Sequence, residues 1–414
     1  MPNVSGGPRR RSKASWILGI PIAAAVVWGV YASYAPPPVG PMGEVMAPDE
    51  DVLTAQIVNS GIGILRNARL KNGDGVYRRD AHAKNHGCAL ADFSVTERLE
   101  EPFRQGVFAG RKYQAWVRFS SGNEGANSDW KPDARGMAIK VLGVPGTKLL
   151  EGEQDAQTQD FLMIDNPVFF IRNVEEYARL TKFQGEGSQF GYFFEGKNPF
   201  KWRLREFRLG LGILNVDMPL PKALPATEFH SMSAYKLGPR NNVKFMTKPV
   251  ACKAGGDVAS RWVSWSRNGL GDDLRDSLKA DAACFDLMMQ MQVPGKNMPV
   301  EDTTVRWSRN DSPFVTVARV ELKKQDIKPQ MDNGFCENLS FTPWHALPEH
   351  RPVGGLNRVR KAVYQNISRY RRCMNGMFYG EPLNDGSPKF GSKPCSALAP
   401  VPEAGESKTA AGGS

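Results

Sequence analysis

The chain has 414 residues, of which 41% are hydrophobic and 23% are charged, and its formal net charge is +11. This composition is near the average for globular proteins, so it excludes a wholly disordered chain, collagen and a long coiled coil. The length fits one large domain or roughly two or three domains of ordinary size.

An apolar stretch near the N-terminus predicts a membrane helix. Four basic residues precede it: Arg9, Arg10, Arg11 and Lys13. The stretch runs from Trp16 to Tyr34, and at 1.5 Å per residue it spans about 28 Å, close to the thickness of a bilayer core. We therefore expect residues 1–35 to form a cytoplasmic stub and a single-pass anchor in a bacterial inner membrane, with the body on the periplasmic side. Export followed by signal cleavage is the alternative.

The remaining chain divides by composition into a linker, a body and a tail. Residues 36–51 are Pro-rich and then acidic, which predicts a linker, and residues 396–414 have the composition of a disordered tail. The body between them, residues 52–395, carries the chain's six cysteines. An even number of cysteines in an exported body permits disulfides, although ordinary buried thiols explain them equally well.

Within the body, strand-like alternation comes first and helical periodicity mostly later. Strands are predicted at Tyr113–Ser120, Gly136–Leu142, Phe161–Ile164 and Phe314–Leu322. Helices are predicted at Val174–Leu180, Lys201–Leu211, Leu274–Asp286 and Leu356–Arg372. This order favours an α+β fold with an antiparallel sheet or barrel.

The segment from His350 to Gly380 holds seven basic residues and no acidic one. A solvated helix face near a membrane explains this pattern, and so does a site for a buried anionic ligand; nucleic acid is a poor third explanation, because the body faces away from the cytoplasm. Arg360 and Tyr364 are four residues apart, so on a helix they share a face to which Arg371 returns. A guanidinium beside a phenol stabilises phenolate, and phenolate oxygen is a known ligand of haem iron.

Five motifs follow one another along the body: HAK at 82–84, VRFS at 117–120, D-x-RGMAIK at 133–140, NPVFFIR at 166–172 and R-x-x-x-Y-x-x-x-x-R at 360–369. This order resembles the haem catalase superfamily, and most closely its small bacterial catalase-related members, over residues 53–375. The resemblance implies a catalase-like antiparallel β-barrel with surrounding helices and haem b inside.

The resemblance also implies roles for individual residues. His82 matches the distal histidine that takes a proton from peroxide and delivers it to the leaving oxygen, and Ser120 matches the serine that orients it. Tyr364 matches the proximal iron ligand, and Arg360 matches the arginine that keeps the phenol ionised. The remaining matches are Arg79, Arg118 and Arg371 for the haem propionates, and Phe119 and Phe170 for the apolar wall.

Two departures from the family pattern lie on the distal side. Asp165 falls where the family has an asparagine if no gap is allowed, and Asn166 follows one place on. An aspartate there would change the charge at the position that helps to bind peroxide. Ala81 stands where typical catalases have valine before the histidine, which would enlarge the pocket or its entrance.

The sequence therefore predicts haem-dependent breakdown of peroxides, of the catalase or peroxidase type. A membrane-tethered site with a roomier pocket would suit organic or lipid hydroperoxides. The electron donor is unknown, nucleic acid is not an expected partner, and a homo-oligomer is left open. The alternative is a haem-binding envelope protein without catalysis, which Asp165 favours.

Overall fold

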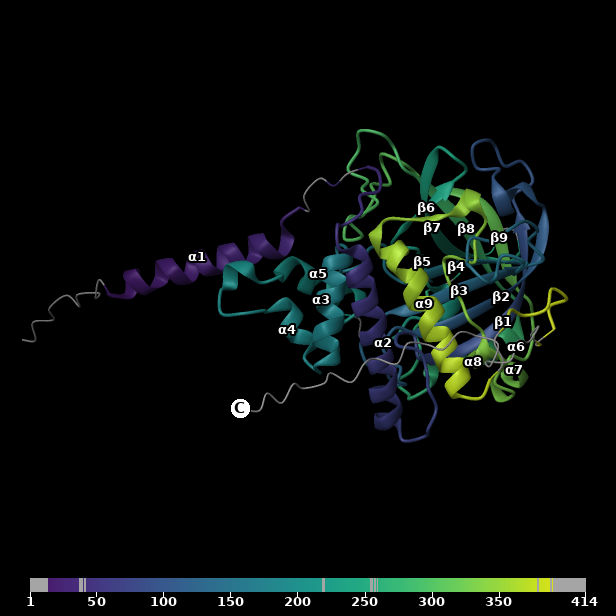
Figure 1. The fold of residues 1–414 in the computed structure, drawn as a ribbon, viewed down its shortest axis with the longest axis horizontal. Coiled ribbons are helices and arrows are strands. Elements are labelled where there is room, and N and C mark those ends of the chain that lie inside the picture. The colour runs from purple at the N-terminus through teal and green to yellow at the C-terminus, as the bar shows by residue number, and fades with distance from the viewer. Residues whose placement is uncertain are drawn as a thin grey trace, which may run out of the picture.

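The computed structural model describes residues 14–36, 40, 42–217, 220–253, 256, 258, 260–377, 380–387 and 389, and for residues 14–22 the backbone alone. Its centre is a closed antiparallel β-barrel of eight strands (Figure 1), in the order β7-β5-β4-β3-β2-β1-β9-β8, with β8 pairing back to β7. The barrel strands are β1 (Lys84–Val95), β2 (Lys112–Ser121), β3 (Arg135–Leu142), β4 (Thr158–Ile164), β5 (Phe229–His230), β7 (Asn241–Val250), β8 (Ala283–Met291) and β9 (Val315–Leu322). Two short strands, β6 (Ala234–Leu237) and β10 (Pro352–Val353), extend the sheet beyond β7.

The barrel interior is a packed apolar core. Phe93 stacks on Phe161 with ring centroids 6.2 Å apart, and Phe161 meets Phe245 edge to face at 5.0 Å. Alternating residues of each strand point into this core, because successive side chains of a strand face opposite sides. The filled interior means that the expected position of a cofactor inside the barrel is wrong. The candidate site residues instead project from the outer barrel surface and from a neighbouring helix.

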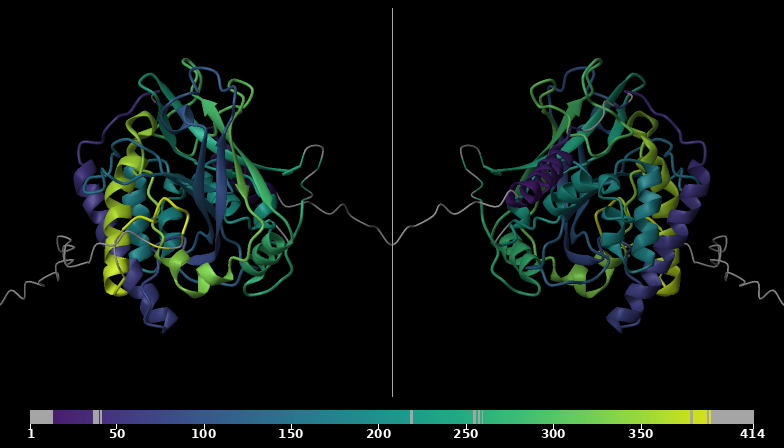
Figure 2. Two further views of the ribbon diagram at one scale, coloured as in Figure 1. Left: turned by 90° about the vertical axis from the view of Figure 1, so that its right-hand side faces the viewer. Right: turned by 90° about the vertical axis from the view of Figure 1, so that its left-hand side faces the viewer.

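Helices lie around the outside of the barrel, except the first, which extends away from it (Figures 1 and 2). They are α1 (Ala14–Tyr34), α2 (Glu50–Asn72), α3 (Val174–Gly185), α4 (Gln189–Phe193), α5 (Leu204–Ile213), α6 (Gly269–Ala280), α7 (Lys328–Asp332), α8 (Phe335–Asn338) and α9 (Gly355–Met374). Helices α2, α3 and α9 lie side by side on one flank and share an apolar cluster. Helices α6, α7 and α8 pack against β1.

Helix α9 owes its place to a regular apolar stripe. Its buried residues on this stripe recur at steps of three and four: Leu356, Val359, Val363, Ile367 and Tyr370. That spacing puts them on one face of a helix, where they pack against α2 and α3. The burial leaves a second face, with Arg360 and Tyr364, free to carry polar side chains.

The N-terminal part of the chain differs from expectation in one respect. Ala14–Tyr34 does form a helix, but within the described ranges we find no helix that is both long and apolar enough to cross a membrane. The predicted transmembrane anchor is therefore unsupported. Helix α2 begins at Glu50, and the preceding segment lies on the body through Glu44, which accepts hydrogen bonds from Arg351 and Arg358. The predicted tail, residues 396–414, falls outside the described residues.

Most expected strands and helices are present, but the helix predicted at Leu274–Asp286 is wrong in its second half. Helix α6 ends at Ala280, and Asp281 is extended with φ −153° and ψ 170°. Strand β8 then begins at Ala283 and buries Phe285, Leu287 and Met289 at every second position. No glycine or proline marks the change of period from helix to strand in this segment, which hides it in the sequence.

The described cysteines are all disulfide-bonded. One bridge joins Cys88 of β1 to Cys336 of α8, which are 248 residues apart, and another joins Cys252 to Cys284, which are 32 apart. Cys373 is disulfide-bonded as well. The first bridge fixes the short helix α8 on the outer barrel surface next to β1.

We predict that replacing Cys88 and Cys336 by Ala lowers the free energy of unfolding by about 2–5 kcal/mol, because the bridge closes a long loop in the unfolded chain. The bridge between Cys252 and Cys284 closes a shorter loop, so the Cys252→Ala, Cys284→Ala double variant is expected to lose less free energy of unfolding. Chemical denaturation of both variants measures the difference. An equal or reversed order would contradict the loop-closure argument.

Candidate active site

His82 lies on the turn that leads into β1 and is held in a strained conformation. Its φ of 58° is in the left-handed region, which non-glycine residues seldom adopt. The backbone N–H of His82 donates to the carbonyl of Gly122 at 2.9 Å, and its carbonyl accepts from the Arg118 guanidinium at 3.0 Å. These two hydrogen bonds hold the His82 backbone in this conformation, and the imidazole therefore lies against β2 and β3.

The His82 ring is oriented by a serine and a glycine. Nδ1 of His82 shares a hydrogen bond with Oγ of Ser120, at 3.0 Å. A Cβ atom at Gly136 would lie 2.6 Å from Nδ1, so only glycine allows the ring to approach this closely. The structure thus brings together the predicted pair of His82 and Ser120 and leaves Nε2 as the nitrogen available to a substrate.

The imidazole of His82 is neutral at ordinary pH. Burial lowers its pKa from 6.5 to about 3, and three positive charges add to the shift, those of Arg118, Arg79 and Arg360. A neutral imidazole is a proton acceptor, which is the state that a general base needs. The effect of Arg360 also shows that α9 and His82 lie within electrostatic reach of each other.

Tyr364 and Arg360 lie together on α9, as predicted from their spacing. A guanidinium nitrogen of Arg360 donates to Oη of Tyr364 at 3.2 Å. Burial alone would lower the pKa of Arg360, but the Tyr364 and Tyr235 phenols raise it above its ordinary value. The other Arg360 nitrogen donates to the side-chain oxygen of Asn357 at 3.0 Å, and Asn357 is fully buried.

The three arginines assigned to an acidic cofactor gather around one carboxylate. Arg79 donates to Oε1 of Glu337 at 2.8 Å, and Arg371 donates to the Glu337 carbonyl at 2.7 Å and to its carboxylate at 3.4 Å. Arg118 lies close enough for its charge to act on the same carboxylate. Burial would raise the pKa of Glu337, but these guanidinium groups hold it below its usual range. One carboxylate therefore faces three positive charges.

Two of these arginines keep a donor unused. Arg118 and Arg371 are 3% and 1% exposed, and within the described residues the Nε atom of each is buried without a hydrogen-bond partner. Burial lowers the pKa of both groups well below the usual value. Buried donors of this kind are costly unless a partner is supplied, so the cluster fits a ligand with additional carboxylates.

The remaining predicted residues lie apart from this arrangement. Asp165 accepts from the backbone N–H of Arg135 at 2.8 Å and from the Asn215 amide at 2.9 Å, and burial raises its pKa to about 6. Asn166 accepts from the backbone N–H of Val168 at 3.2 Å.

The two predicted wall residues face different surroundings. Phe119 is fully buried in the barrel core against Phe229 and Phe285, on the opposite side of β2 from Arg118. Phe170 packs instead among the aromatic rings of α4, next to Phe193 at 5.8 Å.

Four residues that interact with the candidate site were not predicted from the sequence: Asp80, Tyr177, Glu337 and Asn357. Burial raises the pKa of Asp80 to about 6, and burial together with Asp80 and Tyr364 raises the pKa of Tyr177. Asn357 is three residues before Arg360, so helical spacing could have indicated it. Glu337 is 258 residues from Arg79, and no local pattern announces that contact.

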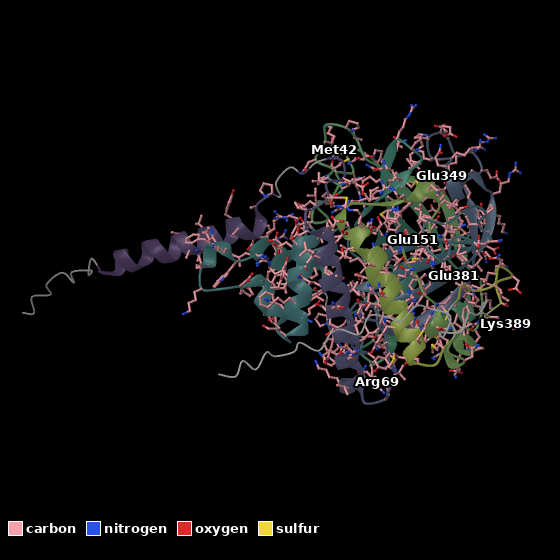
Figure 3. The ribbon with its side chains drawn as sticks, viewed as in Figure 1. Met42, Arg69, Glu151, Glu349, Glu381 and Lys389 are labelled. Carbon is pink, nitrogen blue, oxygen red and sulfur yellow. A yellow bond between two sulfur atoms is a disulfide. The ribbon has the colours of Figure 1, made fainter. Side chains whose placement is uncertain are left out.

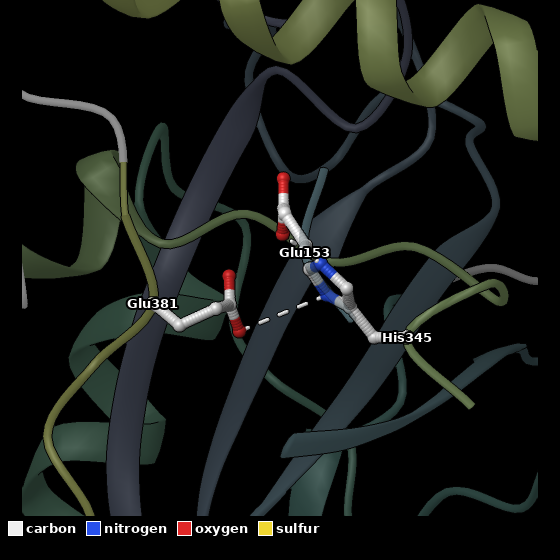
Figure 4. Close-up of side chains that lie close together, drawn as sticks. All are labelled: Glu153, His345 and Glu381. Atoms are coloured by element: carbon white, nitrogen blue, oxygen red, sulfur yellow. Dashed lines mark hydrogen bonds and ion pairs between the residues drawn. The ribbon is translucent and has the colours of Figure 1, made fainter. Parts of the chain in front are cut away.

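A separate buried cluster surrounds His345 beside the barrel wall (Figure 4). Oxygens and ring nitrogens of Glu153, His345 and Glu381 lie within 4.8 Å of one another, as metal ligands do. However, Nδ1 of His345 is 2.9 Å from Asp160 and Nε2 is 2.5 Å from Glu153, so both nitrogens face carboxylates. Lys140 also pairs with Asp160 and Glu381. Because both ring nitrogens of His345 face carboxylates and Lys140 pairs with two of them, neither nitrogen is free to bind a metal, and we infer no metal site.

The cluster is coupled to α9 through its neighbours. The indole N–H of Trp344 donates to the carbonyl of Asn357 at 2.7 Å. Lys361 of α9 pairs with Glu151, labelled in Figure 3, at 2.8 Å. The first contact holds the loop that carries His345 against the helix that carries Tyr364, and the second holds the loop that carries Glu153 against the same helix.

Comparison with known proteins identifies the family of the chain. The model of the catalase family matches residues 68–379, so the chain belongs to the catalase family. A catalase from an endobacterium of Onchocerca volvulus is 23% identical over 353 residues, which cover 78% of this chain and 69% of that protein. Catalase A of Pseudomonas putida is 22% identical over 321 residues, which cover 72% and 63%.

Solved catalase structures share the fold. Catalase A from Saccharomyces cerevisiae superposes with a TM-score of 0.54 at 17% identity and covers 82% of this chain and 67% of its own. A fungal catalase gives 0.53 at 18% identity, with 82% and 66% covered. The present chain thus spans about two thirds of the length of these proteins.

We predict that His345 stabilises the fold in a pH-dependent manner. Burial alone would lower its pKa, but Glu381 and Asp160 raise it from 6.5 to about 9. The contribution is therefore fully present below about pH 6.5 and is lost as pH rises through about 9, so His345→Gln should cost about 2–3 kcal/mol near pH 6 and much less near pH 10. Thermal or urea unfolding across this range measures it.

His350→Gln is the matched control, because burial lowers the pKa of His350 to about 4 and leaves it neutral over the same range. Its cost should not change with pH between neutral and alkaline conditions. A His345→Gln penalty that is constant with pH would show that the imidazole carries no charge in the folded protein.

Proposed function

We propose that this chain is a haem-dependent oxidoreductase that breaks down peroxides. The observation that carries the proposal is the pairing of two units within electrostatic reach of each other: His82 with Ser120, and Tyr364 with Arg360. The first unit is a neutral base held in a fixed orientation. The second is a phenol beside a permanently charged guanidinium. Membership of the catalase family supports this assignment.

The residues present fit haem b. Tyr364 would supply an oxygen ligand to the iron, and Arg79, Arg118 and Arg371 would hold the propionates. The surplus of guanidinium groups over carboxylates, and the unused Nε donors of Arg118 and Arg371, support a ligand that brings acidic groups of its own. Arg360 favours the ionised phenol that binds ferric iron.

The haem supplies the redox chemistry with which the O–O bond is cleaved. His82 would do the proton transfer: Nε2 would accept a proton from the peroxide and return it to the oxygen that leaves. Ser120 fixes the imidazole through Nδ1, and Gly136 leaves the space in which the ring lies. The low pKa of His82, about 3, means that the imidazole is neutral and that Nε2 carries no proton before the peroxide arrives.

We also propose that the body works outside the cytoplasm, because its disulfides persist in oxidising compartments. Organic hydroperoxides remain part of the proposal, since Ala81 is small and exposed beside His82. A second candidate is haem binding without catalysis. Asp165 favours it, because both its oxygens are engaged by Arg135 and Asn215 in place of a substrate.

We predict that Tyr364→Phe abolishes the tyrosinate-type visible spectrum of the haem-loaded protein, since the variant lacks the ligating oxygen. Tyr370→Phe changes a tyrosine on the same helix whose phenol oxygen accepts a hydrogen bond from Arg66, and it should keep that spectrum.

His82→Ala should bind haem yet lose about 100-fold or more in peroxide turnover, the usual range for a lost general base. Retained turnover would remove His82 from the mechanism, and a colourless wild-type preparation would contradict haem binding.

We further predict that Glu337→Gln destabilises the cofactor-free protein by about 3 kcal/mol, because three guanidinium groups lose their carboxylate. The loss should be much smaller in the haem-loaded protein, where propionates supply negative charge. Thermal unfolding of both forms measures this, with the exposed Glu321→Gln as control. Equal losses with and without haem would show that the arginines do not bind the propionates.

A further inference from the structure

The part of the body from which α1 extends consists of α4, α5 and the segment between them (Figure 1), and it carries large exposed apolar side chains. Phe190 is 69% exposed, Phe200 is 74% exposed and Leu211 is 37% exposed. Single exposed apolar residues are common on proteins, but several large ones on one part of a surface indicate that something binds there. We call this part, residues 189–213, the α4–α5 face.

The exposed rings of this face lie on a framework of further aromatic side chains. The ring centroid of Phe207 is 6.4 Å from that of Phe190 and 5.0 Å from that of Phe194. Trp202 meets Phe194 edge to face at 5.5 Å, and its indole N–H donates to the carbonyl of Gly196 at 3.2 Å. These contacts hold the face in shape, so little conformational entropy is lost when a partner covers it.

Helix α1 packs beside this face and still leaves Phe200 largely exposed. Trp28 of α1 meets Phe200 edge to face at 5.0 Å. The guanidinium of Arg208 donates to the carbonyl of Ser33 at 2.9 Å and lies over the ring of Tyr34. The apolar surface continues onto α1, whose exposed side chains include Val26, Val27, Val30 and Tyr31.

The charges that the α4–α5 face leaves uncompensated are positive. Its two acidic residues are engaged, because Glu195 pairs with Arg179 at 2.8 Å and Glu206 is buried beside two arginines. Lys197 and Lys201 are exposed, and neither forms an ion pair with a residue that the structure describes. The face therefore combines exposed aromatic rings with unpaired ammonium groups.

A bilayer surface with anionic lipids matches this combination. Aromatic rings favour the headgroup region, and lysines next to them keep their stems on apolar surface while their ammonium groups reach lipid phosphates. A second copy of the chain matches less well, because a two-fold contact covers the same face on both copies and brings their lysines toward one another. The charge of the face thus favours lipid over a second copy.

We propose that the α4–α5 face docks on the surface of a bilayer that contains anionic lipids, with Phe190 and Phe200 among the headgroups and Lys197 and Lys201 at the phosphates. The docking concerns the surface of the body and does not require α1 to cross the bilayer. None of these four side chains belongs to the candidate active site, so the inference does not rest on the proposed function.

Amide hydrogen exchange followed by mass spectrometry tests the docking on the full-length protein, because it reports residues 189–213 separately from α1. Vesicles of equal parts phosphatidylcholine and phosphatidylglycerol should slow exchange in this range by about fivefold or more at low salt. Vesicles of phosphatidylcholine alone, or anionic vesicles at high salt, should slow it much less, because the lysines then find little negative charge.

The Lys197→Gln, Lys201→Gln double variant should lose most of this protection. The matched control is the Lys131→Gln, Lys324→Gln double variant, which removes two exposed lysines elsewhere and should keep the protection. Peroxide turnover without vesicles should be the same in both variants as in the wild type, so a failure of the proposed function would leave this test unaffected.

The Phe190→Ser, Phe200→Ser double variant tests the apolar part of the contact and should also lose most of the protection, even with anionic vesicles. Both residues are exposed, so thermal unfolding should confirm that the variant folds like the wild type. Exchange that anionic vesicles do not slow, or slow equally in the wild type and in the lysine and phenylalanine variants, would overturn the inference. Protection that appears without vesicles as the protein concentration rises would also overturn it and would assign the face to a second copy.

Discussion

The concentration of guanidinium groups between the barrel wall and α9 determines the character of the site. Arg79, Arg118 and Arg371 face a single acidic side chain, Glu337, and Arg360 lies within reach from the helix. Their positive charges favour the ionised forms of phenol and carboxyl groups and the neutral form of the imidazole. The same charges are costly to bury, because each must be removed from water. The fold tolerates them only where carboxylates or carbonyl oxygens take up the donors, and a cofactor with its own acidic groups would complete that arrangement.

Strand β2 connects the stability of the barrel to the geometry of the site. Phe119 points inward and packs among core aromatic rings, while its neighbours Arg118 and Ser120 point outward and hold His82 from two directions. Since successive residues of a strand face opposite sides, neither set can move without the other. The dense interior is thus the rigid support for a site that lies wholly outside it.

How far sequence reasoning reached depends on the range of the interactions. The pairing of Arg360 with Tyr364 follows from four-residue spacing on a helix, and the main strands follow from alternation, so local rules sufficed for both. The role of Glu337 depends on a contact across 258 residues, which no periodicity encodes. Phe119 was assigned by its place in a motif, yet strand alternation directs it into the core. The helix expected through Asp286 was wrong in its second half because the chain changes from helix to strand at Asp281 without a glycine or proline to mark the boundary.

The bridge between Cys88 and Cys336 has a bearing on biogenesis. Helix α8 is only four residues long, and it carries Glu337 one position after the bridged cysteine. So short a helix has little stability of its own. Its position on the barrel therefore depends on the disulfide, on the packing of Phe335 against Trp116 and on the arginine hydrogen bonds to the Glu337 carbonyl. A newly made chain in a reducing compartment would lack this disulfide. Glu337 would then be held less firmly, and it would neutralise the charges of the arginine cluster less completely. Oxidation of Cys88 and Cys336 would therefore help to place Glu337 among Arg79, Arg118 and Arg371.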